Sequence, residues 1–166
     1  RESALQENEE RYRLLFQKSI VGIMQFDAQL RIVDFNERLI AIMRTTRELV
    51  TGFDMNTLVD QSLLPSIRRA LAGKEGFYEG PYHTTTSSAD TWISSRTAPL
   101  LDDGGRVLGG MAIIEDITDR KAATEERARL ISAIEQAAEA VVILSTEGAV
   151  LYLNPAAENI LGWPLE

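Results

Sequence analysis

The stretch SIVGIMQFDAQLRIVDFNERLIAIM, residues 19–43, occurs a second time as AAEAVVILSTEGAVLYLNPAAENIL, residues 137–161. The copies lie 118 positions apart, since residue 19 falls on residue 137, and nearly every apolar position stays apolar between them. Asn36 falls on Asn154 in this comparison. Self-similarity at a fixed offset is typical of a repeated structural unit. The sequence therefore predicts one complete unit and the opening third of a second.

Each copy has the pattern of a β-hairpin followed by a helix. Two apolar strands separated by a polar turn occupy residues 22–35 and again residues 140–153. Asn36 and Asn154 come next, and asparagine is a preferred N-cap because its side chain accepts a hydrogen bond from the first helical turn. Asn36 could instead contact a ligand, but the N-cap explains its position better.

The rest of the first unit predicts further helices and three more strands. Helical patterns occupy residues 47–50, 54–59 and 62–72, and strand patterns occupy residues 76–86, 91–101 and 106–117. The turn Asp102-Asp103-Gly104-Gly105 links the last two strands as a hairpin. This order predicts an α+β domain in which a five-stranded antiparallel sheet carries its helices on one face.

Amphipathic helices flank this domain. Residues 2–18 carry Leu5, Tyr12, Leu15 and Phe16 near one helix face, which is too apolar for a solvated arm. Residues 119–138 carry a weak apolar seam with a seven-residue spacing. We therefore expect a homodimer formed through the flanking helices.

The predicted organisation has four parts. A flanking helix at residues 1–18 precedes a complete domain at residues 19–118. A linker helix at residues 119–138 then leads to the truncated start of a second domain at residues 139–166. The absence of an initiating Met predicts a piece cut from a longer protein.

Composition excludes several classes of function. With 25 acidic and 17 basic residues the chain is not expected to bind nucleic acid, whose phosphates require neutralising cations. The absence of Cys excludes a cysteinyl flavin and a Cys-ligated zinc, and the single histidine, His83, excludes a multi-histidine metal site. No apolar run approaches the roughly 20 residues that span a bilayer, so we expect a cytoplasmic protein without a membrane span in this segment.

Several segments resemble the PAS family and the adjoining segment called PAC. The opening hairpin carries Gly22-Ile23 and Asp27, then Ile32-Val33-Asp34-Phe35-Asn36. The later matches are Trp92-Ile93-Ser94, Ala98-Pro99-Leu100 with Asp102, Gly105-x-Val107-x-Gly109-Gly110, and the closing Glu115-Asp116-Ile117-Thr118-Asp119-Arg120-Lys121. The resemblance covers about residues 13–121 and resumes at about residue 131.

The resemblance implies a sensory input and dimerisation module of a bacterial signal-transduction protein. A sensor histidine kinase of a two-component system is the expected parent, with the output domain in the same chain. A diguanylate cyclase or phosphodiesterase is the alternative parent, and a ligand-free structural dimerisation domain is the alternative role. No catalytic constellation occurs in these 166 residues, so the segment itself is not expected to be an enzyme.

Four residues of the last three strands are ligand-pocket candidates: Tyr82, Trp92, Arg96 and Met111. Strand alternation places Trp92 and Arg96 on one face of their strand. If that face is concave, Arg96 could hold a carboxylate through two hydrogen bonds. If it is the outer face, Arg96 is a surface charge. A pocket of a few hundred cubic ångströms would favour ligand sensing, and a filled interior would favour a relay role.

No cofactor is predicted, although an unidentified small molecule could bind; a non-covalent flavin has no positive signal in the sequence. Haem-binding members of the family carry the iron ligand on the long helix before the third strand. That helix here has the sequence SLLPSIRRALAG, without histidine, so haem is not expected.

The end of the last strand is the expected relay. Asp116 is predicted to join this strand to the following helix by hydrogen bonds, and Thr118 is predicted to cap that helix. By the resemblance, the Asp116-Ile117-Thr118 junction passes the signal from the sheet to the C-terminal helix.

Overall fold

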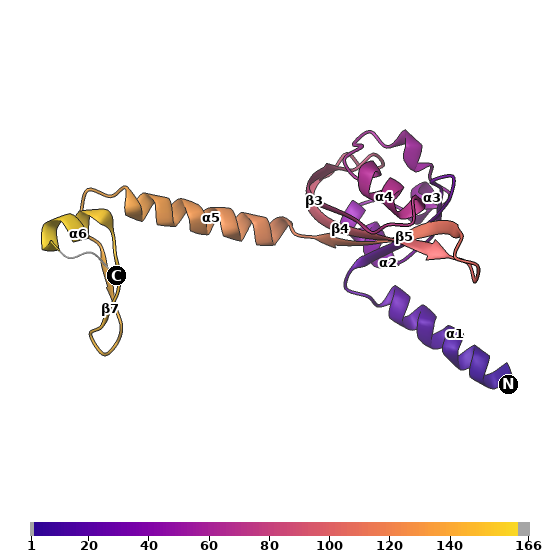
Figure 1. Ribbon diagram of the computed structural model, residues 1–166, viewed down its shortest axis with the longest axis horizontal. Coiled ribbons are helices and arrows are strands. Elements are labelled where there is room, and N and C mark those ends of the chain that lie inside the picture. The colour runs from indigo at the N-terminus through magenta and orange to yellow at the C-terminus, as the bar shows by residue number, and fades with distance from the viewer. Residues whose placement is uncertain (1, 163–166) are drawn as a thin grey trace. The chain divides into compact units, whose positions relative to one another are not determined.

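The computed structural model describes residues 2–162 of the 166-residue chain (Figure 1). The chain divides into two compact units, Arg1–Thr118 and Asp119–Glu166, and each is described by itself. Residues 163–166 of the predicted second domain lie outside the described residues, as does residue 1 of the predicted flanking helix.

The first hairpin consists of β1 (Gly22–Asp27) and β2 (Ile32–Phe35), which pair antiparallel. Alternation along β1 buries every second side chain, as expected for a strand with one covered face. In the turn, the Asp27 carboxylate accepts hydrogen bonds from the backbone N–H groups of Gln29 and Arg31, each at 2.9 Å. These bonds explain how the predicted polar turn closes.

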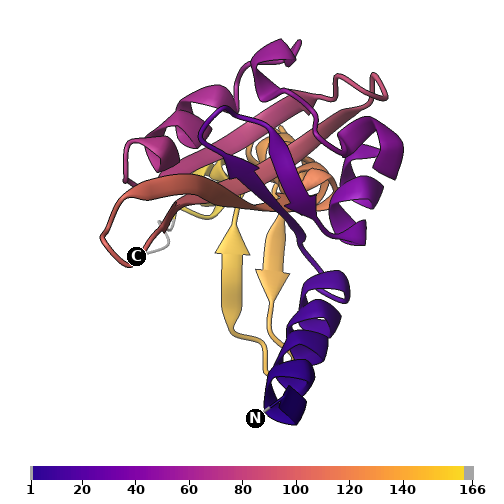
Figure 2. The ribbon, with the colours of Figure 1, turned by 90° about the vertical axis from the view of Figure 1, so that its right-hand side faces the viewer.

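Three later strands complete the sheet: β3 (Gly76–His83), β4 (Asp90–Leu101) and β5 (Val107–Asp116). The strand order is β2-β1-β5-β4-β3, and all neighbours pair antiparallel (Figure 2). The first hairpin therefore lies beside the last strand. This confirms the α+β fold with a five-stranded antiparallel sheet.

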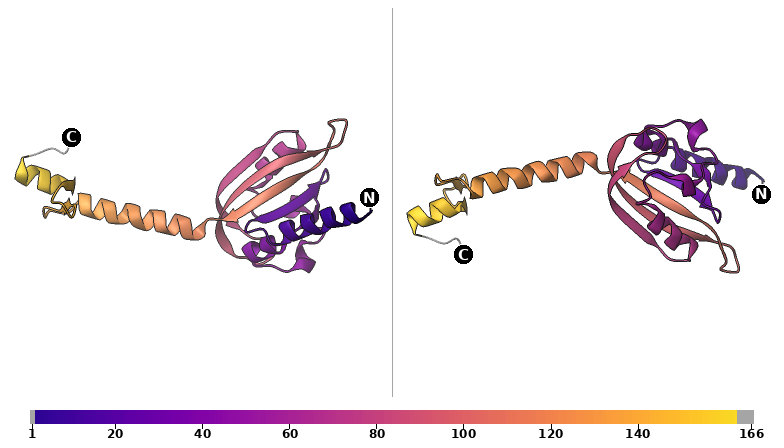
Figure 3. Two further views of the ribbon diagram at one scale, coloured as in Figure 1. Left: turned by 90° about the horizontal axis from the view of Figure 1, so that it is seen from below. Right: turned by 90° about the horizontal axis from the view of Figure 1, so that it is seen from above.

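Short helices cover one face of the sheet (Figure 3). They are α2 (Glu37–Met43), α3 (Arg47–Val50), the 3₁₀ turn η1 (Met55–Thr57) and α4 (Leu64–Leu71). The predicted helix at residues 62–72 is shorter in the structure, because α4 begins at Leu64 with Pro65 in its first turn. The predicted helix at residues 54–59 is a single 3₁₀ turn.

The hydrophobic core lies between these helices and the sheet. Its most buried large side chains are at most 1% exposed, and they are Phe26, Met55, Ile67, Ile93 and Ile114. They come from β1, η1, α4, β4 and β5, so the core joins both halves of the sheet. Inward and outward positions alternate along β4 and β5, and this alternation decides which candidate residues face the core.

Helix α1 (Glu2–Gln17) precedes the sheet and packs on it through its last turn. The Phe16 ring is 7% exposed and stacks on the Tyr12 ring, with centroids 5.7 Å apart. The Tyr12 hydroxyl oxygen accepts a hydrogen bond from the side-chain amide of Gln25 at 3.1 Å. Other apolar side chains of the helix stay exposed, namely Leu5, Leu14 and Leu15.

The second unit repeats the first hairpin after helix α5 (Thr118–Glu135). Its elements are β6 (Val142–Leu144), β7 (Val150–Leu153) and α6 (Pro155–Leu161). The Ser145 hydroxyl accepts bonds from backbone N–H groups two and four residues later, as the Asp27 carboxylate does in the first unit. None of the helices within residues 2–162 is long and apolar enough to cross a membrane.

Two left-handed backbone positions also coincide between the repeats. Leu30 and Arg44 have φ of 63° and 48°, and the second unit has Gly148 and Gly162 at the equivalent positions, with φ of 86° and 69°. A non-glycine residue in this region costs roughly 1–2 kcal/mol. The buried side chain of Leu30 offsets that cost, because a glycine would lose its contribution to the core.

Candidate functional site

The interior of the first unit contains a cavity of about 60 Å³ between the sheet and its helices. Its walls are almost entirely apolar and include Met24, Leu39, Phe53, Met55, Ile67 and Tyr82. Pockets that hold drug-sized ligands measure about 300–1,000 Å³. This cavity therefore matches the filled interior of the relay prediction better than a metabolite pocket.

Tyr82 is the one pocket candidate that lines this cavity. Its side chain points inward from β3 and is 4% exposed. Burial raises the pKa of the Tyr82 hydroxyl, and the nearby Asp60 carboxylate and Tyr78 act in the same direction. The cavity wall is therefore uncharged at physiological pH, which suits only a neutral and largely apolar occupant.

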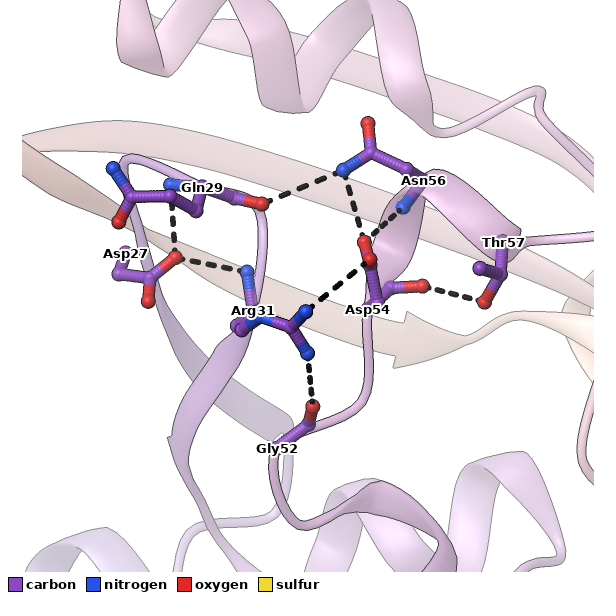
Figure 4. Close-up of polar contacts among 7 residues, drawn as sticks. All are labelled: Asp27, Gln29, Arg31, Gly52, Asp54, Asn56 and Thr57. Atoms are coloured by element: carbon purple, nitrogen blue, oxygen red, sulfur yellow. Dashed lines mark hydrogen bonds and ion pairs between the residues drawn. The ribbon is translucent and has the colours of Figure 1, made fainter.

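One wall of the cavity is held by polar contacts between the first hairpin turn and the segment at residues 52–57 (Figure 4). The Arg31 guanidinium donates to the Gly52 carbonyl oxygen at 3.5 Å and lies 3.7 Å from the Asp54 carboxylate. The Asn56 side-chain amide donates to Asp54 at 2.9 Å and to the Gln29 carbonyl oxygen at 3.4 Å. These contacts hold Phe53 and Met55 in the wall.

The other three pocket candidates lie on the outer face of the sheet and do not line the interior cavity. Trp92 and Tyr82 do meet in a hollow at the surface, which Thr118 also lines. Trp92 and Arg96 alternate with buried β4 residues, and Met111 does the same on β5. The Arg96 guanidinium lies over the Phe77 ring, 5.3 Å from its centroid, in a shallow outer hollow that Met111 also lines. Of the two possibilities for Arg96, the structure shows the surface position.

His83 lies at the end of β3, outside the interior cavity. Its Nδ1 lies 2.8 Å from the Asp90 carboxylate, and its backbone N–H donates to Asp60 at 2.9 Å. The residues that line the interior cavity include no histidine.

Asn36 is fully buried and its side chain makes four hydrogen bonds. The Oδ1 atom accepts from the backbone N–H groups of Leu39 at 3.1 Å and Ile23 at 2.9 Å. The Nδ2 atom donates to the carbonyl oxygens of Phe16 and Val21, both at 2.9 Å. The N-cap is therefore present, and the same side chain also holds the end of α1 against β1.

The junction at the end of β5 is hydrogen-bonded to the backbone of β4 through both Thr118 and Ile117. The Thr118 hydroxyl accepts a hydrogen bond from the Trp92 N–H at 3.0 Å and donates to the Asp116 carboxylate at 2.6 Å. The Ile117 N–H donates to the Trp92 carbonyl oxygen at 2.8 Å, and the Thr91 hydroxyl lies 3.0 Å from that of Thr118. The Thr118 hydroxyl thus faces the sheet rather than the helix amides that it was expected to cap.

The Asp116 carboxylate completes the junction by accepting the Thr118 N–H at 2.9 Å. Burial alone would raise the pKa of Asp116, but the hydrogen bonds from Thr118 outweigh it and lower the pKa, helped by Thr91 and by the positive charge of Arg44. A carboxyl whose pKa is lowered on folding stabilises the fold above its unfolded pKa. That contribution is lost as the pH falls through the folded-state value.

The double role of Asn36 was not predicted, although the sequence carries a signal for it. Asp and Ser cap helices about as well as Asn does, yet Asn stands at this position in both repeats. Only Asn combines the capping oxygen with an N–H₂ group that can donate to two carbonyl oxygens.

The first unit thus has a five-stranded antiparallel sheet with helices on one face and a small, largely apolar interior. The family described as PAS fold matches residues 16–122, and a family described as PAS domain matches residues 128–166. The chain belongs to the PAS family.

Solved structures are similar to this chain over most of its length. A PAS domain from Colwellia psychrerythraea is 20% identical with a TM-score of 0.57, covering 68% of this chain and 99% of that one. A PAS domain of an HTR-like protein from Haloarcula marismortui is 21% identical with a TM-score of 0.57, covering 70% and 97%. The PAS domain of BvgS from Bordetella pertussis is 21% identical with a TM-score of 0.53, covering 78% and 99%. A comparison with curated proteins found no match.

Proposed function

We propose that this chain is the relay and dimerisation part of a bacterial cytoplasmic sensor histidine kinase. Its first PAS domain passes a signal from the sheet through the Asp116-Ile117-Thr118 junction into α5. The catalytic output belongs to another part of the same polypeptide, and the chain described here dimerises and transmits the signal.

The observation that carries this proposal is the attachment of α5 to the sheet at the junction. The first residue of α5, Thr118, bonds both to the Trp92 backbone of β4 and to Asp116 at the end of β5. A shift of β4 relative to β5 therefore changes the position of the helix start directly. The polar groups of this junction have few alternative partners, because its donors and acceptors are already paired with one another.

The small cavity supports a relay domain whose interior is filled by its own side chains. Its volume of about 60 Å³ is far below the roughly 300–1,000 Å³ of pockets that hold drug-sized ligands. An occupant would be small and uncharged. This size favours the ligand-free alternative over sensing of a metabolite, a flavin or a haem by this domain.

Replacing Thr118 by Val tests the relay. Valine keeps the volume and removes the hydroxyl, which leaves the Trp92 N–H and the Asp116 carboxylate without this partner. Two hydrogen bonds are lost at about 1 kcal/mol each, so amide hydrogen exchange in residues 118–124 should accelerate at least about fivefold. Exchange of the buried amides of β1 and β5 should stay unchanged.

Thr124→Val is the matched control for this experiment. Thr124 is exposed in the same helix, and its hydroxyl donates to the Arg120 carbonyl oxygen at 2.8 Å. It should leave exchange at the helix start unaffected. Equal effects of the two substitutions would mean that the junction does not hold α5, and the proposed relay would fail.

Dimerisation is proposed to use the exposed apolar side chains of α1. Leu5 is 68% exposed and Leu15 is 67% exposed, although Phe16, next to Leu15, is buried against the domain. Burial of such side chains against a second copy would contribute about 1.5–3 kcal/mol each.

Leu15→Glu is expected to weaken the dimer at least tenfold, as measured by sedimentation velocity over a range of concentrations. The change places a charge on an exposed position, so the domain itself should stay folded. Leu101→Glu is the control, since Leu101 is similarly exposed at 53% but lies at the β4–β5 turn. A parent chain that stays monomeric at high concentration would contradict the dimer.

A further inference from the structure

Asn154 reproduces the contacts of Asn36 one for one. Its Oδ1 atom accepts from the backbone N–H groups of Val141 at 2.8 Å and Ala157 at 2.9 Å. Its Nδ2 atom donates to the carbonyl oxygens of Ile134 at 3.0 Å and Glu139 at 2.9 Å. All four partners stand 118 positions after the partners of Asn36, and both asparagines are 0% exposed.

Each asparagine joins three elements of its unit. The carbonyl oxygens of Phe16 and Ile134 belong to the last turns of α1 and α5, where carbonyl groups run short of helical amide partners. The other partners are the start of the hairpin and the first turn of the following helix. A displacement of the preceding helix therefore acts on the hairpin and on the next helix through one buried side chain.

Helix α5 is consequently hydrogen-bonded at both of its ends. Thr118 fastens its start to the sheet of the first domain, and Ile134 in its last turn is held by Asn154 of the second hairpin. Resting on the relay proposed above, we infer that Asn154 is the positioning residue through which the second PAS domain takes up movements of α5. The helix that carries the output of the first domain is thus the input helix of the second.

The requirement for an amide separates this role from helix capping. An aspartate at position 154 keeps the oxygen that caps Ala157, but it replaces the donor with an oxygen facing two carbonyl oxygens. A serine keeps a capping hydroxyl without a buried charge, but it is too short to reach all four partners. Both changes leave the cap and remove the attachment to α5.

The test is a double-mutant cycle on the full chain, read by the amide NMR resonances of Val141 and Ala157. In the chain that keeps Asn154, Thr118→Val should shift these resonances, because the perturbation travels along α5 to Asn154. In Asn154→Asp and Asn154→Ser the shift should vanish. Hydrogen exchange in residues 131–136 should also accelerate by about tenfold in both variants, because the attachment of the last turn is lost.

Thr146→Asp is the charge-matched control for Asn154→Asp. It adds a negative charge to an exposed turn of the same hairpin, away from Asn154, and should leave the response to Thr118→Val intact. A response that persists in both Asn154 variants overturns the inference. If Thr118→Val, with Asn154 unchanged, accelerates exchange at the start of α5 but does not shift the resonances of Val141 or Ala157, this inference fails and the relay stands. If it alters neither, the relay itself fails.

Discussion

Asn36→Ala is expected to lower the free energy of unfolding of the first domain by about 4 kcal/mol, from the lost cap and the stranded partners. The substitution removes an N-cap worth about 1 kcal/mol. It also strands the Ile23 N–H and the carbonyl oxygens of Phe16 and Val21, which are buried or partly buried. Each stranded group costs about 1–3 kcal/mol when water cannot replace the lost partner.

Urea denaturation followed by circular dichroism measures this loss. Asn8→Ala is the matched control, because Asn8 is exposed on α1, where alanine is the better helix former. It should leave the domain as stable or slightly more stable. A loss below about 1 kcal/mol for Asn36→Ala would show that the cap alone accounts for the residue.

Gly76→Ala is the second substitution with a large expected effect, a loss of about 3 kcal/mol. A Cβ atom at this position would overlap the Ser66 carbonyl oxygen and the Thr97 hydroxyl, and would lie 2.8 Å from the Ser66 carbonyl carbon. The Ser66 carbonyl group belongs to the backbone of α4, so the helix must move away from β3. That movement breaks the hydrogen bond from the Thr97 hydroxyl to the Ser66 carbonyl oxygen, which is 2.7 Å long.

Thermal and urea unfolding of Gly76→Ala should therefore agree on a lower stability. Gly104→Ala is the control, since its Cβ would meet only the flexible Asp102 carboxylate at 3.3 Å in an exposed turn. It should change the stability by less than about 0.5 kcal/mol. Equal stability of the two variants would mean that α4 does not pack closely against Gly76 in solution.

Features that depend on neighbours in the sequence were predictable. The polar turns at Asp27 and Asp102, the alternation along β4 and the cap at Asn36 all depend on residues a few positions apart. The repeat indicated a hairpin at the start of each unit, and the order of strands with their hairpin turns predicted a single antiparallel sheet. Helix ends were less certain, because a short helix such as α4 is stabilised mainly by packing.

The sequence pattern did not show which face of β4 is buried. One face carries Trp92 and Arg96, while the other carries Ile93, Ser95 and Thr97, so neither is clearly the more apolar. Helix α4 settles the matter by packing on the second face, where the Ser66 carbonyl oxygen meets Thr97. Trp92, Arg96 and Met111 were therefore candidates for a pocket that only Tyr82 reaches.

The sequence by itself determined the PAS fold, the repeat and the residues of the exit junction, because strand alternation, turn chemistry and capping act over short separations. Only the tertiary structure decided the size of the cavity, the face of Arg96 and the partners of Asn36. Cavity volume depends on how side chains from eight helices and strands fill a common space. The carbonyl oxygen that Asn36 binds comes from Phe16, 20 residues earlier, and no local pattern specifies a hydrogen bond across that separation.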